Sequence, residues 1–404
     1  MSSCVPLPSI VLKKHRFDKP LKLYGKIKEL LLYTDYNYYV FVKNSLSSSG
    51  HKDSHMKPET MKQFSFKRTD NEIDRAIDQL IGLVDNTEHP DLIREMIIAA
   101  LKAGREDNDR AHLRLMNSTM KEMRFTGKIF GPYSGIRKVT VFGSARTQPD
   151  EPIYEMARQF GKMLADAGYM IITGAGSGIM HAANEGAGPE RSFGVNILLP
   201  FEQKPNPVLV GNPRLITYKY FFNRKVAFLK EADAVALFPG GFGTLDEAME
   251  TLTLLQTGKH APLPLVLIDE PGGTYWARWM KFLREELLAE GYIEDNDFSL
   301  FERVYSVETA VDVINTFYRR YHSMRYVEKK LVIRMLSAID DESITQLKEH
   351  FNDILHPGGQ IRISDALPEE ADEPEIAHLP RLIVDFNLQD FGRMRTLINE
   401  INAI

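Results

Sequence analysis

Hydrophobic residues recur in two rhythms along this chain. Between residues 70 and 127 they fall three and four positions apart, which is typical of one face of an amphipathic helix. The pattern restarts after Pro90 and again near residue 110, so we predict three helices here. The residues that set the spacing are Ile73, Ile77, Leu80, Ile81 and Val84, then Ile93, Met96, Ile97 and Leu101, then Leu113, Met116, Met120 and Met123.

The methionines of the third helix form a stripe. Such a stripe more often packs in a core or against a partner helix than takes part in chemistry, because the thioether is flexible and apolar. We interpret residues 56–135 as a helical N-terminal region, either a cap or a dimerisation arm.

From Lys138 onward, short apolar runs alternate with glycine turns and helical patterns. Strands are expected at 139–142, 169–173, 194–199, 232–238 and 263–268. Helices are expected at 154–167, 222–231, 274–290 and 307–320, and two more follow the second and third glycine turns, one ending at 187 and one beginning after 243. This alternation predicts an α/β fold, a doubly wound, parallel, Rossmann-like sheet over residues 136–321. Ligands of such sheets bind beyond the carboxyl ends of the strands, where all three glycine turns are expected.

Residues 322–404 predict a small α+β C-terminal appendage. Strands are expected at 331–335, 360–364 and 382–386, with helices at 342–355 and 391–401. The acidic run at 369–375 interrupts them. Such a run is usually a solvated loop, which is the expectation here.

Residues 1–55 differ from the rest. They are rich in Lys, Arg and Tyr and end in a Ser-rich stretch, without the apolar segment of a signal peptide. We expect a disordered or non-native extension, with Met56 as the start of the native chain. A targeting segment is the alternative.

Composition narrows the class of protein. With 404 residues, 43% hydrophobic and 26% charged, the chain is expected to be globular and to hold two or three domains. A net charge of -5 favours no nucleic-acid partner. One cysteine, Cys4, excludes a disulfide framework within the chain, and no apolar run is long enough for a membrane span. We expect a cytoplasmic protein without a membrane partner.

The glycine turns differ in what they specify. Gly174, Gly176 and Gly178 lack the spacing of the dinucleotide fingerprint, and no acidic residue closes the next strand to hold a ribose diol. No phosphate-binding loop with a Gly-Lys-Ser/Thr ending occurs either. NAD binding and ATP hydrolysis of that kind are therefore not expected.

The stretch from Pro239 to Glu247 is more specific. An apolar strand ends at Pro239, glycines follow at 240, 241 and 243, and a helix opens near Thr244. Glycines allow a tight turn and close backbone approach to a ligand. The free N–H groups and dipole of the helix start favour an anion, so this stretch predicts a phosphate site.

The same stretch resembles the LOG family, also labelled "lysine decarboxylase-like", in its longer bacterial branch. The family pattern P-G-G-x-G-T-x-x-E is complete here, and an Arg-Lys pair on the preceding helix also matches. The matching residues are Pro239, Gly240, Gly241, Gly243, Thr244 and Glu247, with Arg224 and Lys225. The resemblance covers residues 138–321.

The resemblance implies a phosphoribohydrolase that cleaves a nucleoside 5′-monophosphate to free base and ribose 5-phosphate. The substrate phosphate would lie on the N–H groups of Gly240, Gly241, Gly243 and Thr244. Glu247 would stabilise the oxocarbenium-like ribose and orient water, while Arg224 would hold the ribose or phosphate and keep Glu247 ionised.

Further substrate-binding positions follow from the resemblance. They are Lys225, Thr253, Gly143, Ser144, Gly176, Met180 and Glu202, with Asn184 in the second glycine motif. His181 replaces a glycine that is usual in the family, and we interpret it as structural. The sequence predicts no metal site, since no His, Asp or Glu cluster has metal-ligand spacing, and no cofactor. No Ser or Cys lies in a nucleophile elbow either.

Other interpretations stay open. A non-catalytic nucleotide or molybdenum-cofactor carrier shares the fold and glycine motif, whereas a pyridoxal-phosphate decarboxylase follows only from the old label. In the family the site lies at a subunit interface, so a homodimer or higher homo-oligomer is expected. Base preference, whether plain purine, pyrimidine or N6-prenyl adenine, is expected to depend on loop 200–220. The terminal regions could gate the pocket or bind a regulatory nucleotide.

Overall fold

The computed structural model describes residues 66, 71–84, 86–107, 109–200 and 204–404. Apart from Phe66, these residues all fall within one compact unit. The extension predicted at residues 1–55 lies outside the described residues. The boundaries predicted at 135 and 321 stay predictions.

Three N-terminal helices are present where the apolar spacing predicts them. They are α2 (Glu72–Gly82), α3 (Pro90–Glu106) and α4 (Arg110–Phe130). The side chain of Asn71 accepts a hydrogen bond from the Asp74 N–H and caps α2, and Asp109 caps α4 in the same way. Met116 and Met120 are 47% and 50% exposed, so this part of the stripe is not core of the chain itself.

Seven strands form a parallel sheet, which confirms the predicted α/β, doubly wound fold. The strands are β1 (Lys138–Phe142), β2 (Met170–Thr173), β3 (Ser192–Ile197), β4 (Leu215–Tyr218), β5 (Ala234–Leu237), β6 (Leu265–Ile268) and β7 (Glu302–Val304). Their spatial order is β4-β3-β2-β1-β5-β6-β7. The chain reverses its direction of progress between β1 and β5, and such a switch point is where open α/β sheets bind ligands.

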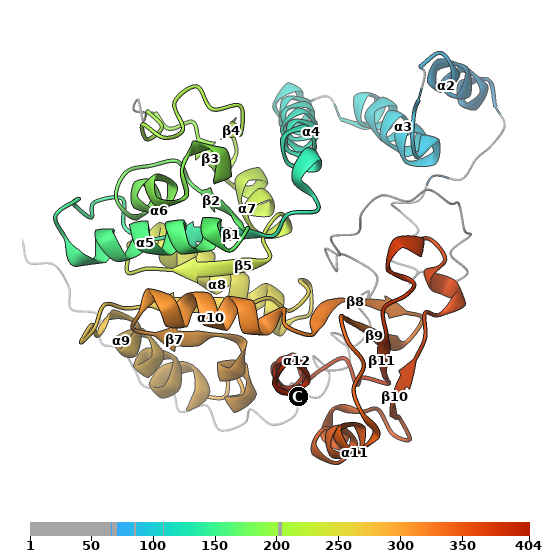
Figure 1. The fold of residues 1–404 in the computed structure, drawn as a ribbon. Helices are drawn as coiled ribbons and strands as arrows, with labels where there is room; N and C mark the ends of the chain where they lie inside the picture. Colours follow the sequence, from blue (N-terminus) through green and yellow to red (C-terminus); the bar gives the residue numbers. More distant parts are fainter. Residues whose placement is uncertain (1–65, 67–70, 85, 108, 201–203) are drawn as a thin grey trace, which may run out of the picture. The chain divides into compact units, whose positions relative to one another are not determined.

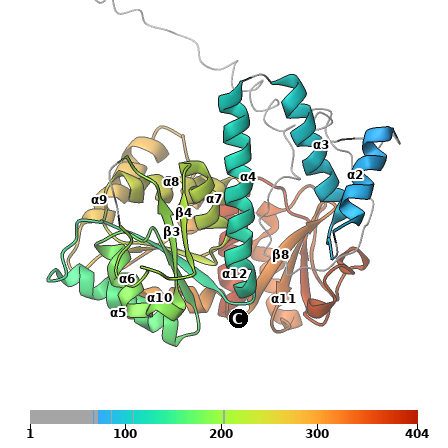
Figure 2. The same ribbon diagram turned by 90° about the horizontal axis from the view of Figure 1, so that it is seen from above.

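Both faces of the sheet are covered by helices (Figures 1 and 2). Successive strand residues point to opposite faces, so Val139 and Val141 enter one core while Phe142 enters the other. The first core is shared with α5 (Pro152–Asp166), α6 (Ile179–Ala187) and α10 (Val307–Phe317). The second is shared with α4, α7 (Phe221–Lys230), α8 (Phe242–Gln256) and α9 (Tyr275–Phe282).

Some elements differ from the prediction. Strands β4 and β7, at the two edges of the sheet, were not predicted, because Leu215–Tyr218 ends a Pro- and Asn-rich stretch and Glu302–Val304 contains no apolar run. Strand β4 lies within the stretch expected to be loop between residues 200 and 220. The helix expected over 274–290 is α9 followed by a π-helical turn, η4 (Leu283–Leu288).

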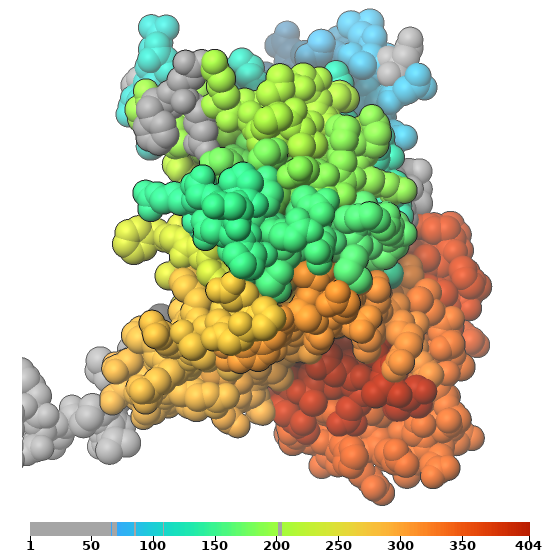
Figure 3. Space-filling view, turned by 60° about the vertical axis from the view of Figure 1, so that its left-hand side comes forward, coloured from blue at the N-terminus to red at the C-terminus, as the bar shows by residue number. Residues whose placement is uncertain are grey.

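The C-terminal region forms a second, antiparallel sheet in the order β10-β11-β9-β8. Its elements are β8 (Tyr321–Val327), β9 (Lys330–Met335), α11 (Asp341–His350), β10 (Ile361–Ser364), β11 (Arg381–Val384) and α12 (Phe391–Ala403). The predicted small α+β appendage is confirmed, although β8 was missed. In Figure 3 the dark red surface of α12 lies directly beside orange residues that precede it in the sequence.

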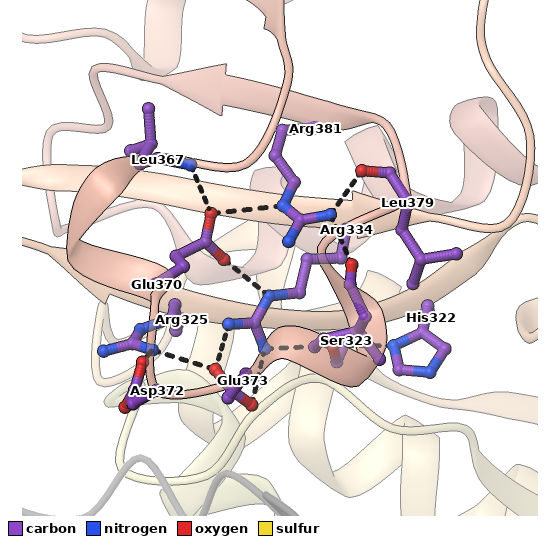
Figure 4. A network of polar contacts seen from close by, with 11 residues as sticks. His322, Ser323, Arg325, Arg334, Leu367, Glu370, Asp372, Glu373, Leu379 and Arg381 are labelled. Carbon is purple, nitrogen blue, oxygen red and sulfur yellow. Dashed lines mark hydrogen bonds and ion pairs between the residues drawn. The ribbon is translucent and has the colours of Figure 1, made fainter. Parts of the chain in front are cut away.

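The expectation that the acidic run is a solvated loop is wrong. Glu370 and Glu373 are almost fully buried against Arg334 and Arg381, two arginines with no exposed surface (Figure 4). Glu370 lies between them, with an oxygen 2.8 Å from Arg334 Nε and another 3.1 Å from Arg381 Nε. Arg334 and Arg381 are direct partners across β9 and β11. The acidic run therefore neutralises two buried like charges that face each other.

Candidate functional site

The three glycine turns meet at the carboxyl ends of β1, β2 and β5. The Ser144 N–H donates to the Pro239 carbonyl at 3.0 Å, and the Ile179 N–H donates to the Ser144 carbonyl at 3.0 Å. A Cβ on Gly143 would lie 2.6 Å from Ile179 Cγ2, so a larger residue would separate the first two turns. The predicted positions Gly143 and Ser144 thus join the turn of the specific motif to the second glycine turn.

Glycines of the main motif have two separate roles. A Cβ on Gly240 would collide with Thr244, whose Cβ would be 2.8 Å away, and with the Gly143 carbonyl carbon at 3.0 Å. A Cβ on Gly241 or Gly243 would meet nothing within 4 Å. Gly240 is therefore needed for packing, while Gly241 and Gly243 border open space where a ligand can approach.

Gly241 is the N-cap of α8, and no side chain caps this helix. The first N–H groups of an α-helix have no acceptor within it, so those of Gly241, Phe242 and Gly243 are available to an anion. The Thr244 N–H instead donates to the Gly241 carbonyl at 3.1 Å. The anion site predicted over residues 240–244 is therefore centred on Gly241–Gly243, with Thr244 N–H already engaged.

Glu247 lies one helical turn beyond this opening, on α8. It is 3% exposed, and its Oε2 has no hydrogen-bond partner among the described residues. Burial raises the pKa of Glu247 to about 7, although Lys225 and Arg224 nearby act in the opposite direction. A buried carboxyl with a free oxygen and a pKa near neutrality is typical of a general acid or base.

Arg224 and Lys225 reach this region from α7. Arg224 is packed over the rings of Phe221 and Phe228, and its Nε has no hydrogen-bond partner among the described residues. Burial lowers its pKa, while the charge of Glu247 acts to raise it. The buried Nε of Arg224 is therefore left without an acceptor among the described residues.

Lys225 is engaged by carboxylates. Its Nζ lies 2.6 Å from Glu250, 2.8 Å from Asp246 and 3.8 Å from Glu247. This arrangement suits a residue that orients the acidic side chains of α8. Substrate binding by Lys225 stays a prediction.

The second glycine turn is covered by part of loop 200–220, through Asn206, a residue that the sequence did not single out. The Asn206 N–H donates to Ala175 at 2.8 Å, and its Nδ2 donates to the Gly176 carbonyl at 3.1 Å and to Asn184 at 3.0 Å. Met180 packs over Gly174, with Sδ 2.9 Å from where a Cβ would lie. Gly176 and Met180 thus belong to the turn beside the site, and Asn206 holds it in place.

One predicted position, Thr253, is not brought to Glu247. It follows Glu247 by six positions, about 240° round the helix, and lines an apolar cavity of about 110 Å³ with Met249 and Gln256. The predicted position Glu202 lies outside the described residues, so its role stays a prediction.

His181, interpreted from the sequence as structural, is hydrogen-bonded by its Nδ1 to the Tyr154 hydroxyl at 3.0 Å. Among the described residues, no three or more His, Cys, Asp or Glu side chains gather closely enough to hold a metal ion. No helix in this described part combines the length and apolar character needed to cross a bilayer.

The chain was compared with protein families and with proteins of known function. Residues 177–314 match a family model described as "Possible lysine decarboxylase". The chain is 28% identical over 168 residues to the cytokinin riboside 5′-monophosphate phosphoribohydrolase LOG of Oryza sativa subsp. japonica, covering 40% of this chain and 66% of that protein. It is 26% identical over 186 residues to LOG3 of Arabidopsis thaliana, covering 45% and 81%.

Among solved structures, the molybdenum cofactor carrier protein of Chlamydomonas reinhardtii is similar at 19% identity and a TM-score of 0.31, covering 45% of this chain and 96% of that one. A score this low adds nothing to the assignment. The family match covers Arg224 and the glycine motif that leads to Glu247. Through its α/β region, this chain is similar to proteins of the LOG family.

Proposed function

We propose that the chain is a nucleoside 5′-monophosphate phosphoribohydrolase, with AMP or a cytokinin riboside monophosphate as substrate. The observation that carries the proposal is Glu247, buried with one free carboxylate oxygen, a single turn from an uncapped, glycine-lined helix start. Relatives carrying the phosphoribohydrolase name are consistent with it.

The chemistry follows from the charges that develop. The phosphate monoester would bind the N–H groups of Gly241, Phe242 and Gly243, which places the ribose toward Glu247. One helical turn spans about 5.4 Å, close to the length of a ribose. Arg224, which is always charged, would hold the phosphate or a ribose hydroxyl.

Cleavage moves the electron pair of the C1′–N bond onto the departing base and leaves positive charge on C1′ and the ring oxygen. Ionised Glu247 would stabilise that charge and accept a proton from the attacking water. The new C1′–O bond gives ribose 5-phosphate, the base takes up one proton from solvent as it leaves, and Glu247 returns the proton of the attacking water to solvent. General-base assistance of this kind contributes about 10²–10⁴-fold to rate.

The test is incubation of the purified chain with AMP, GMP, CMP, UMP and an N6-substituted AMP, followed by chromatography of free base. We expect base from at least one, and loss of about a hundredfold or more in kcat for Glu247→Gln. Glu308→Gln is the matched control, because Glu308 is an exposed carboxylate in the first turn of α10.

Absence of base with every monophosphate would refute the proposal. Stable ligand binding without turnover would indicate a carrier instead.

We also propose a homodimer or larger homo-oligomer, and the cytoplasmic location expected from the sequence stays a prediction.

A further inference from the structure

The peptide between Gly240 and Gly241, at the opening of α8, is flanked by a glycine on each side. Both flanking residues lack a Cβ, so rotation of the peptide plane meets little steric resistance. Its N–H belongs to Gly241, the first donor of the opening of α8. If this plane turned over, a carbonyl oxygen would face the anion in place of an N–H.

One side chain holds this peptide. The Tyr275 hydroxyl donates to the Gly240 carbonyl at 2.7 Å. In a trans peptide the C=O and the following N–H point in opposite directions. Because Tyr275 draws the Gly240 oxygen to its own side, the Gly241 N–H is directed away from Tyr275.

Tyr275 is itself fixed by the ends of the neighbouring strands. It is the first residue of α9, and its ring packs edge-on against Trp276. The Trp276 N–H donates to Asp269 at 3.3 Å, and Arg303 binds both Asp269 and the Gly273 carbonyl. These contacts therefore hold the Tyr275 hydroxyl in place beside the ends of β6 and β7.

Burial raises the pKa of Tyr275, with the hydrogen bond to Gly240 acting in the opposite direction. The hydroxyl consequently stays protonated, and able to donate, through the neutral range.

We propose that Tyr275 is a positioning residue for phosphate: it locks the Gly240–Gly241 peptide so that the Gly241 N–H faces the substrate. The assignment rests on the proposed function for the identity of the anion. It extends that function by giving the glycine motif a partner on a different helix, outside the motif itself.

The experiment compares wild type, Tyr275→Phe and Tyr292→Phe in the full chain. Tyr292 is an exposed tyrosine, so its variant controls for loss of a hydroxyl. Binding of ribose 5-phosphate, inorganic phosphate and adenosine is measured by calorimetry, alongside KM and kcat for AMP. Ribose 5-phosphate is used because its affinity does not depend on the base.

We expect Tyr275→Phe to bind ribose 5-phosphate and phosphate about fivefold more weakly, since a hydrogen bond of this kind contributes about 1 kcal/mol. Adenosine, which lacks the phosphate, should bind as to wild type, and the loss should appear mainly in KM. A general structural defect would change all three ligands together.

Unchanged ribose 5-phosphate affinity in Tyr275→Phe would overturn the assignment even if wild type hydrolyses AMP. Conversely, binding of ribose 5-phosphate that depends on Tyr275, without any release of base, would support the assignment and refute the hydrolase. A crystal structure of unliganded Tyr275→Phe gives a readout independent of ligands. A Gly240–Gly241 peptide that is flipped, fully or in part of the molecules, supports the assignment. The present orientation at full occupancy contradicts it.

Discussion

At the scale of single residues, Glu247 illustrates a conflict between stability and chemistry. Its carboxyl is buried beside Lys225 and Arg224, yet burial is the larger influence and its pKa lies near 7. The folded protein therefore holds the proton on Glu247 more tightly than the unfolded chain does. Folding stability should fall as pH rises from about 4.5 to about 7 and change little above that range.

This gives a prediction with two opposite signs. At pH 8 the free energy of unfolding of Glu247→Gln should exceed that of wild type by up to about 3 kcal/mol, and the variant should unfold at a higher temperature. Near pH 4 the two proteins should be equally stable. For wild type, kcat/KM should decline below about pH 7, as the carboxylate takes up its proton. Thermal unfolding at both pH values and a pH–rate profile check this. Lower stability of the variant at pH 8 would contradict it.

Adjacent glycines of the motif provide a matched pair. Gly240→Ala forces a methyl group into Thr244 and the Gly143 backbone, so we expect a loss of about 1–3 kcal/mol in stability. Gly241→Ala meets no neighbour, and its φ of -89° suits alanine. Its stability should therefore stay near that of wild type while ribose 5-phosphate binding weakens. Unfolding curves and calorimetry test both, and equal effects of the two variants would refute the separation of roles.

At the scale of elements, the segment at residues 367–376 shows how a polar run becomes structural. Arginines on neighbouring strands face each other without solvent, and like charges placed so are destabilising unless a counter-charge joins them. Glu370 supplies that charge. Burial acts to raise its pKa, but hydrogen bonds from the Leu367 N–H and both arginines outweigh this and lower it.

Glu370→Gln should therefore destabilise the C-terminal region by about 3–5 kcal/mol, because two buried guanidinium groups lose their shared carboxylate. Glu369→Gln, at an exposed neighbouring position, is the control and should have little effect. Urea unfolding of both variants measures the difference. A Glu370→Gln protein as stable as the control would show that the network contributes no net stability.

At the scale of the whole molecule, helix α8 connects the site to the rest of the chain. Gly258, two residues after the end of α8, is packed so closely by the Phe391 ring of α12 that no Cβ would fit there. The Ser299 hydroxyl also donates to the Gly392 carbonyl at 2.6 Å, which joins α12 to the segment after η4. The C-terminal appendage thus bears directly on the helix that carries Glu247.

The outward face of α8 supports the proposed self-association. Phe242 is 94% exposed, and Met249 and Thr253 lie within about 40° of it round the helix, opposite Glu247. Light scattering should give a mass of about twice the 46.1 kDa of one chain. Met249→Glu should lower that mass, whereas Leu336→Glu, at another exposed apolar position, should not. A monomeric wild type would refute the proposal.

The sequence by itself determined the parallel α/β sheet, the three N-terminal helices and the position of the glycine motif. These features depend on local periodicity, and on glycine's lack of a Cβ, both of which can be read along the chain. It could not reveal β4 and β7, since these two short edge strands, unlike β5 and β6, are not parts of longer continuous apolar runs.

Only the tertiary structure decided which groups meet across distant segments. Tyr275 reaches Gly240 from 35 positions away, Asn206 reaches Gly176 from 30, and Glu370 reaches Arg334 from 36. Hydrogen bonds and burial of this kind depend on spatial neighbours, and a run of letters does not distinguish a buried carboxylate from a solvated one. For that reason the acidic run was expected in solvent, while the fold places Glu370 between two buried arginines.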